Sequence, residues 1–281
     1  MRTPSPCRRG TVRASRGTGT NTGVNQVIVS TPETAARRYS LLLTTDADDV
    51  AAAQALRYRV FAEELGARLD VAEPGRDTDR FDGFCDHLVV REDATGEIVG
   101  TYRMLPPQRA HAAGGLYADG EFDLSRLDPL RASMVETGRS CVHPDHRAGA
   151  VVGLVWAGIA RYMLLTGHRW LIGCASVPLA DGGMRAAGVW EKVRAKHLAP
   201  EEYRTTPHRP WDPAGAPPHR TTTVPPLLRG YLRLGTWVCG PPAHDPDFGV
   251  ADFPILLGMD HIDQRYLRFF LGEAAGPGVP A

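Results

Sequence analysis

The sequence predicts an α/β fold in which a mixed sheet of about seven strands is flanked by helices. Short runs rich in β-branched and aromatic residues alternate with longer runs of helical periodicity along the 281 residues. An early pair of strand-like runs is separated by a Thr-Gly turn, which indicates an antiparallel hairpin. Later, a strand, a helix and a second strand follow one another at a spacing typical of a right-handed parallel crossover.

Composition and charge exclude several classes of protein. With 43% hydrophobic residues the chain can bury a sizeable core, and equal totals of 32 basic and 32 acidic residues favour neither nucleic acid nor an anionic surface. The longest apolar run, Ala148–Ala160, is shorter than the ~18 residues that cross a bilayer. The five cysteines are scattered without C-x-x-C spacing, so we expect no metal site, reduced thiols and a cytoplasmic protein.

Changes in composition set the expected domain boundaries. Residues 1–37 lack apolar periodicity, which indicates a disordered leader. Residues 38–272 should form one domain, and residues 273–281 a flexible tail. Within the domain, residues 200–226 are rich in Pro, His, Arg and Thr, which predicts a long, mobile loop insertion.

The domain is expected to begin with a strand and a helix. Tyr39–Thr44 is a short apolar run typical of a strand. Asp46 or Asp48 then caps a helix that continues through Leu65. Arg57 lies in this helix, and a surface position is the default for such a residue unless a site lies beside it.

A polar loop and the hairpin follow. The loop, residues 66–86, is either a solvated acidic turn or an acidic wall for a cationic amine. Its closely spaced acids are Asp77, Asp79, Asp82 and Asp86. His87–Arg91 and Ile98–Leu105 form the two hairpin strands, and Arg103 in the second strand either faces solvent or meets an anion.

The second half carries the parallel crossover. Met134–Val142 and Trp170–Val177 are predicted strands, joined by a helix that begins near Ala150. Met184–His197 is a predicted helix. The remaining predicted elements are strands at Tyr231–Cys239 and Phe253–Leu257 and a final helix at Asp263–Leu271.

Two features of the crossover suggest chemistry. Arg147 and Gly149 precede the helix, whose free N–H groups make this segment either a phosphate site or an ordinary turn. Glu136 is either a general base, if burial raises its pKa, or a strand-end partner of Arg139. These two residues point to opposite faces of a regular strand, so we predict a β-bulge at Gly138 that brings them to one face and separates the strand from its neighbour.

Six runs in this sequence are LRYRVFAEELG (56–66), DRFDGFCDHLVV (79–90), GTYRMLPP (100–107), ETGRSCVHPDHR (136–147), GCASV (173–177) and PPLLRGYLRLG (225–235). They cover nearly all of residues 39–270. Together they resemble the L-ornithine Nα-acyltransferases of ornithine-lipid synthesis, within the GNAT superfamily, and the first four also resemble acyl-homoserine-lactone synthases.

The resemblance implies a GNAT-like fold and a specific reaction. A long-chain (3-hydroxy)acyl group passes from the phosphopantetheine thioester of acyl carrier protein, or from acyl-CoA, to the α-amine of L-ornithine. No cofactor is permanently bound, and peripheral association with the inner membrane face stays open. The alternatives are an acyl-homoserine-lactone synthase, another amino-acid N-acyltransferase and a non-catalytic acyl-ligand binding module.

The resemblance also implies site residues. Glu136 and Arg139 are the expected catalytic residues. The expected substrate-binding residues are Arg57, Phe61, Asp79, Asp82 and Arg103. The strand end and the helix start themselves, rather than the resemblance, give the expected phosphopantetheine-binding residues: Cys141, Val142, Arg147, Gly149, Ala150 and Val151. Val151 departs from the small residue of the common GNAT pattern, and its bulk is expected to suit the single phosphate of acyl carrier protein better than the diphosphate of coenzyme A.

Overall fold

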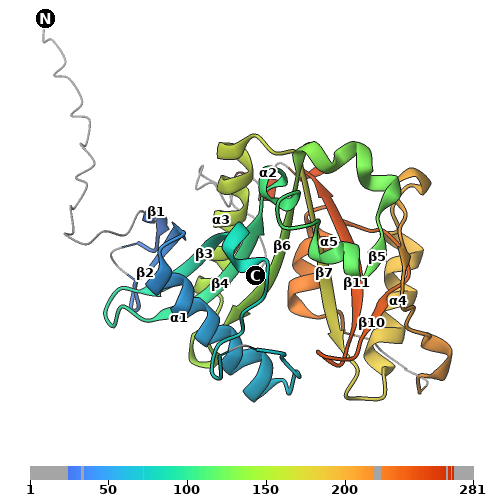
Figure 1. Cartoon of the computed structure of the whole chain (residues 1–281), viewed down its shortest axis with the longest axis horizontal. Coiled ribbons are helices and arrows are strands. Elements are labelled where there is room, and N and C mark those ends of the chain that lie inside the picture. The colour runs from blue at the N-terminus through green and yellow to red at the C-terminus, as the bar shows by residue number, and fades with distance from the viewer. Residues whose placement is uncertain are drawn as a thin grey trace, which may run out of the picture.

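The computed structural model describes residues 25–32, 35–71, 73–217, 223–263, 265–266 and 268. One mixed sheet runs through the molecule, with helices on both faces (Figure 1). In space its strands follow the order β1-β2-β3-β4-β6-β7-β11-β10, and β9 also pairs with β11. Their bounds are β1 Asn25–Ser30, β2 Tyr39–Thr44, β3 Asp86–Glu92, β4 Ile98–Leu105, β6 Met134–Val142, β7 Trp170–Pro178, β9 Trp237–Val238, β10 Ala243–Asp245 and β11 Val250–Gly258.

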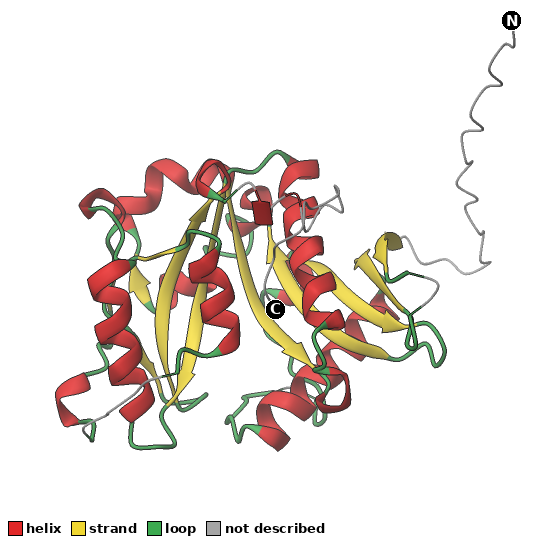
Figure 2. Ribbon diagram, turned by 180° about the vertical axis from the view of Figure 1, so that it is seen from behind, coloured by secondary structure: helices red, strands yellow, loops and turns green. Residues whose placement is uncertain are grey.

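Helices cover the two faces of the sheet unequally. The longer helices α3 and α4 pack with α5 on one face, where they enclose the largest apolar core (Figure 2). The other face is covered by α1 and by the segment that contains α2, which enclose two smaller apolar clusters. The helix bounds are α1 Ala47–Tyr58, α2 Pro107–Ala110, α3 Ala150–Thr166, α4 Met184–Lys196 and α5 Pro226–Arg233.

The first helix begins and ends as its sequence directs. The side chain of Asp46 accepts hydrogen bonds from the backbone N–H groups of Asp48 and Asp49, which confirms the predicted cap. The helix then widens into a π-helical turn, Arg59–Glu64 (η1), in which the N–H of Leu65 bonds to the carbonyl of Val60 at 3.1 Å. Such turns insert one residue and redirect the side chains that follow.

The connection between α3 and its neighbours agrees with the predicted crossover. Gly149, at φ 100°, precedes α3, and Gly167, at φ 70°, ends it. Both values lie in the left-handed region that glycine adopts without strain. No helix in the described part of the chain is long and apolar enough to cross a membrane.

A bulge in β6 confirms the predicted irregularity. Opposite β4, Arg103 pairs with Gly138 and Thr101 pairs with Cys141, so one residue of β4 faces two residues of β6. The residue in the left-handed region is Arg139, at φ 54°, rather than Gly138. On its other side, β6 pairs in parallel with β7 only as far as Thr137 and Gly173, and the two strands are not paired beyond this point.

Gly173 permits the close approach at this point of separation. A Cβ atom added there would lie 2.7 Å from the carbonyl oxygen of Thr137. We therefore expect Gly173→Ala to lower the free energy of unfolding by about 1–3 kcal/mol, because the strands must move apart. Urea unfolding measures this, and Gly153→Ala in α3, where nothing lies within 4 Å, should instead stabilise the protein. An unchanged stability of Gly173→Ala would contradict the steric argument.

Several predictions about the elements were wrong. The described residues place nine strands in the main sheet, not about seven, because β1 and β10 were not predicted. Order begins upstream of residue 38, since β1 pairs with β2. Tyr231–Cys239 was predicted as a strand, but Tyr231 lies in helix α5, which begins after Pro225, and only Trp237–Val238 is a strand.

The segment predicted as a loop insertion is partly structured. Within residues 200–226, Thr206–Pro207 (β8) pairs with Phe122–Asp123 (β5) to form a separate small sheet. A 3-10 turn at Pro213–Gly215 follows. Residues 218–222 and most of the predicted helix Asp263–Leu271 lie outside the described residues.

Candidate active site

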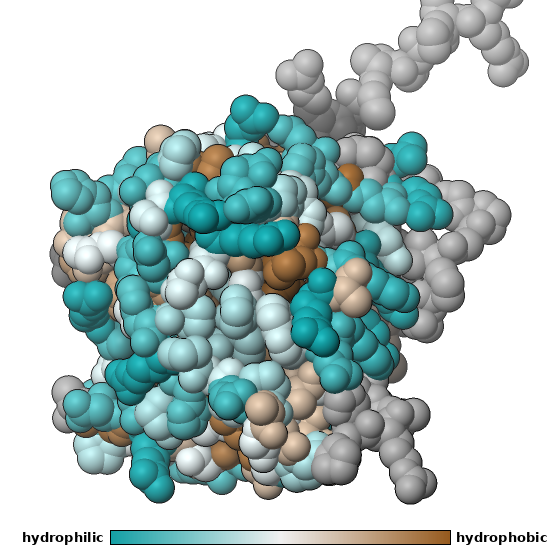
Figure 3. All heavy atoms as spheres, turned by 90° about the vertical axis from the view of Figure 1, so that its right-hand side faces the viewer, coloured by the Kyte–Doolittle hydropathy of each residue, from teal (hydrophilic) through white to brown (hydrophobic). Residues whose placement is uncertain are grey.

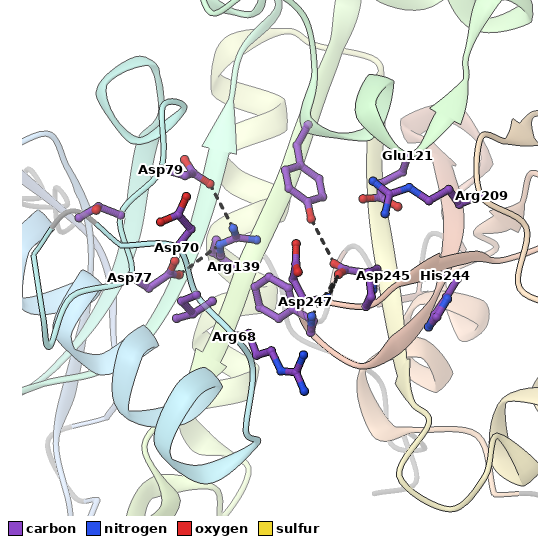
Figure 4. Close-up of a pocket in the computed structure, with 15 residues that line it drawn as sticks. Arg68, Asp70, Asp77, Asp79, Glu121, Arg139, Arg209, His244, Asp245 and Asp247 are labelled. Atoms are coloured by element: carbon purple, nitrogen blue, oxygen red, sulfur yellow. Dashed lines mark hydrogen bonds and ion pairs between the residues drawn. The ribbon is translucent and has the colours of Figure 1, made fainter.

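A cavity of about 200 Å³ lies on the face of the sheet covered by α1, beside the bulge in β6. Figure 4 shows its two walls, with Asp77, Asp79 and Arg139 on one side and Glu121, Asp245 and other polar side chains on the other. Its lining residues are Arg68, Leu69, Asp70, Asp77, Thr78, Asp79, Tyr117, Glu121, Arg139, Arg209, His244, Asp245, Pro246, Asp247 and Phe248.

Beneath one wall, arginines and aspartates from four segments form a buried ion-pair network. Arg57, at 0% exposure, bonds to Asp77 at 2.8 Å and to both oxygens of Asp82 at 2.8 and 2.9 Å. Arg103 contacts Asp79 at 2.6 Å and Asp82 at 3.1 Å. Arg57 is therefore buried beside the candidate site rather than at the surface, and Arg103 meets anions supplied by the chain itself.

The charges of this network hold its carboxylates ionised. Burial alone would raise the pKa of Asp82, but hydrogen bonds from Arg57 and the charges of Arg57 and Arg103 outweigh it and keep the pKa well below its usual range. Burial opposes ionisation of Asp79 in the same way, and Arg103 and Arg139 lower its pKa. These acids already have cationic partners, so the chain itself uses the negative charge that we expected to attract a substrate ammonium group.

Arg139 connects the network to the cavity. Its Nε lies 3.1 Å from Asp77 and its Nη2 lies 3.2 Å from Asp79. Its guanidinium also lies 5.3 Å from the ring centre of Tyr117 and 4.9 Å from that of Phe248. Both rings lie within the distance at which a guanidinium and an aromatic ring attract each other, and a planar guanidinium can bind a carboxylate through two of its N–H groups.

Glu136 lies deeper than Arg139 and does not pair with it. Its two carboxylate oxygens accept hydrogen bonds from the backbone N–H groups of Tyr117 and Ala118, at 2.7 and 2.8 Å. Burial raises the pKa of Glu136 to about 7, against the opposing effect of these two bonds and of Arg103. The carboxylate thus positions the turn that presents Tyr117 to the cavity, and it can exchange a proton near neutral pH.

The expected phosphate loop lies at the other end of β6. The Arg147 guanidinium forms a two-pronged pair with Glu64 of η1 at 2.6 and 2.7 Å, and its Nε donates to the carbonyl of Val142. Gly149 and Ala150 are exposed at the start of α3. A phosphate could approach this helix end, where backbone N–H groups are unpaired.

Two expected contributors to that loop point into the core. Burial raises the pKa of the Cys141 thiol to about 12, which suits a packed side chain and not a nucleophile. Val151 is fully buried against Gly100, where an added Cβ would lie 2.7 Å from its methyl carbon. Because this side chain faces away from the loop, its bulk does not discriminate between one phosphate and two, contrary to expectation.

The structure brings only part of the predicted site to the cavity. Asp79 and Arg139 line it, whereas Arg57, Asp82, Arg103 and Glu136 are buried behind its walls. Phe61 touches the cavity residue Phe248 edge to face, with ring centres 5.8 Å apart. Sequence reasoning missed the opposite wall: Tyr117, Glu121, Arg209, His244, Asp245 and Phe248. The polar-aromatic run from Tyr117 to Phe122 was the available signal.

Comparison with known proteins supports the reading of this fold. Residues 56–157 match the Acetyltransferase (GNAT) domain family. The L-ornithine N(alpha)-acyltransferase of Brucella abortus (strain 2308) is 37% identical over 241 residues, which cover 80% of this chain and 86% of that protein. The protein of the same name from Rhizobium meliloti (strain 1021) is 36% identical over 250 residues, which cover 83% and 84%.

A solved structure of the CoA-dependent acyl-homoserine lactone synthase BjaI with MTA also matches, with a TM-score of 0.49 and 17% identity over 80% of this chain and 83% of that one. The identity to the two named relatives extends over most of their length and over most of this chain. This chain is therefore an acyltransferase with the GNAT fold, and it belongs to the L-ornithine Nα-acyltransferase family.

Proposed function

We propose that this enzyme transfers a long-chain (3-hydroxy)acyl group from acyl carrier protein to the α-amine of L-ornithine, the first step of ornithine-lipid synthesis. The observation that carries the proposal is the match along most of the chain to relatives that are named for this activity. The cavity beside the bulge is consistent with it, because its volume of about 200 Å³ suits a free amino acid and is too small for a long acyl chain as well.

The proposed reaction places the donor where β6 and β7 are no longer paired. The phosphopantetheine arm would lie between these strands beyond Thr137 and Gly173, with its thioester beside the bulge. Backbone N–H groups near Cys141 and Val142 would stabilise the negative charge that develops on the thioester carbonyl oxygen. Transfer would then be direct, without an acylated side chain.

Arg139 and Glu136 have separate proposed roles. The guanidinium of Arg139 binds the α-carboxylate of the acceptor and so sets the position of its α-amine. Glu136 accepts the proton that the α-ammonium group loses, through a water molecule, because the carboxylate is only 7% exposed. Its pKa of about 7 allows it to exist as a base at neutral pH.

The loop before α3 is the proposed site for the carrier phosphate. If Arg147 contacts this phosphate, Arg147→Ala should raise KM for the acylated carrier protein by about tenfold and leave kcat nearly unchanged. Initial rates at several salt concentrations measure this KM. The increase in KM should shrink at high salt, because Arg147 and its partner Glu64 are exposed and salt screens exposed charges. Arg194→Ala on α4 is the matched control, and an unaltered KM in Arg147→Ala would exclude the assignment.

Membrane contact is proposed to be peripheral and to accompany product release. The face shown in Figure 3 is mostly hydrophilic, and its apolar side chains form small separate groups. A product with one long acyl chain is only a weak membrane anchor by itself. More of the protein should therefore sediment with anionic vesicles after turnover than before it. Equal amounts of bound protein would contradict the proposal that membrane contact accompanies product release.

A single assay tests the proposal as a whole. The purified protein receives 3-hydroxyacyl carrier proteins of different chain length, the matching acyl-CoA or acetyl-CoA as control donors, and a panel of amino acids. Mass spectrometry should detect Nα-acyl-ornithine from the carrier protein donors. Preference for acetyl-CoA would show that the enzyme is an acetyltransferase. An acyl lactone without acyl-ornithine would indicate an acyl-homoserine-lactone synthase.

A further inference from the structure

Two carboxylates, Glu121 and Asp245, line the wall of the cavity that faces Arg139 (Figure 4), and the buried carboxylate of Asp252 interacts electrostatically with both. Glu121 follows a short 3-10 turn, Asp245 ends β10, and Asp252 lies in β11. Asp252 pairs directly with Ala243, which is two residues before Asp245 in β10. Because paired residues and alternate residues share one face of a sheet, Asp252 and Asp245 point to the same side. Asp245 lines the cavity, and Asp252, which is not itself a lining residue, lies on the same face of the sheet.

The hydrogen bonds of this group come from neutral donors. Asp245 accepts two backbone N–H groups of the following turn, at 2.9 and 3.1 Å, and the hydroxyl of Tyr117 at 3.4 Å. Asp252 is only 3% exposed, and its Oδ1 has no hydrogen-bond partner. The hydroxyl of Ser176 bonds to the same side chain. A carboxylate oxygen that is buried and unpartnered is costly, and it points to a ligand that completes it.

The three acids also oppose one another. Burial raises the pKa of Asp252 to about 7, and the charges of Asp245 and Glu121 add to this effect, although Ser176 and the charge of Arg139 act against it. Burial and the charge of Asp245 raise the pKa of Glu121 as well, although Arg209 acts against them. A cation placed among these side chains would relieve both the burial of charge and the repulsion. On the opposite wall, Asp77 and Asp79 already have arginine partners.

We infer that Glu121, Asp245 and Asp252 form a subsite for a second ammonium group, so that the preferred acceptor is an α-amino acid whose side chain ends in an amine. The inference rests on the proposed function and names its specificity residues. With its α-carboxylate at Arg139, the acceptor's side chain crosses the cavity to the three acids. An ammonium group has three donors, and Oδ1 of Asp252 offers an acceptor that the chain leaves unused.

Paired acceptors test this inference in the acyl-transfer assay. L-norvaline has the carbon chain of L-ornithine without the terminal amine. The parent protein should prefer ornithine by about 100-fold or more in kcat/KM, because norvaline leaves buried acids without a partner. In Asp252→Asn this preference should collapse to less than about tenfold, because the use of ornithine slows far more than the use of norvaline. Asp260→Asn, an exposed aspartate paired with Arg169, is the matched control.

Stability measurements separate a subsite from a structural role. Asp252→Asn keeps the shape of the side chain and removes a buried charge. The unfolding temperature of this variant should therefore equal or exceed that of the parent protein. Asp245→Asn, which keeps an acceptor for its turn, should reduce the preference in the same direction. Equal losses for both amino acids, or a parent protein that uses norvaline as well as ornithine, would overturn the subsite and leave Nα-acylation standing. Transfer to no α-amino acid would overturn the proposed function and, with it, the subsite.

Discussion

Glu136→Gln should lower kcat for transfer to ornithine by about 100- to 10,000-fold, the usual contribution of a general base. The glutamine keeps the size of the side chain but cannot take the proton of the α-ammonium group. Because burial raises the pKa of Glu136 to about 7, the parent enzyme should lose activity below about pH 7 as the carboxylate is protonated. In the variant, that acidic limb of the pH profile should disappear.

The pH profile distinguishes a base from a purely structural glutamate. Glu136 also accepts the N–H groups of Tyr117 and Ala118, so the variant could displace Tyr117 and lose activity for that reason alone. In that case Glu136→Gln would be slow, but its activity would still fall below about pH 7. Asp252 has a pKa of about 7 as well, and a limb that vanishes in Asp252→Asn but persists in Glu136→Gln would move the base to Asp252.

Arg57→Met should destabilise the protein by about 3–5 kcal/mol, the typical cost of removing one partner from a buried ion pair. Arg57 is fully buried and holds Asp77 and Asp82, which would be left without their principal cation. Urea unfolding at neutral pH measures the loss. Arg38→Met removes an exposed pair with Asp93 at 3.5 Å and should cost less than about 1 kcal/mol.

The same network predicts how stability depends on pH. The pKa of Asp82 is lower in the folded protein than its usual value, so its contribution is fully present above about pH 4 and is lost as the pH falls further. In Arg57→Met the free energy of unfolding should fall less steeply as the pH decreases, because Arg57 is the principal cause of the lowered pKa of Asp82. If Arg57→Met changed neither the free energy of unfolding at neutral pH nor its decrease toward acid pH, Arg103 and Arg139 would be sufficient to pair with Asp77 and Asp82.

Local patterns were enough to predict most of the fold. The cap at Asp46, the hairpin, the crossover through α3 and the bulge after Glu136 depend on residues close in sequence, whose spacing determines their geometry. The errors occurred where tertiary pairing decided the state. Tyr231 lies in a helix because Pro225 and Pro226 start one there and its ring packs against Trp156 of α3, although the run also has strand propensity.

The sequence by itself determined the family, the strand that carries Glu136 and Arg139, and the need for a bulge between them. Only the tertiary structure decided which acids remain available to a substrate. Asp79 and Asp82 looked free in the sequence but neutralise buried arginines, whereas Glu121, Asp245 and Asp252 come together from distant segments, where burial and the neighbouring acids oppose the charge of Asp252. The physical reason is that the pairing of a charge depends on distance in space and on burial, and strand order sets both for residues far apart in the chain.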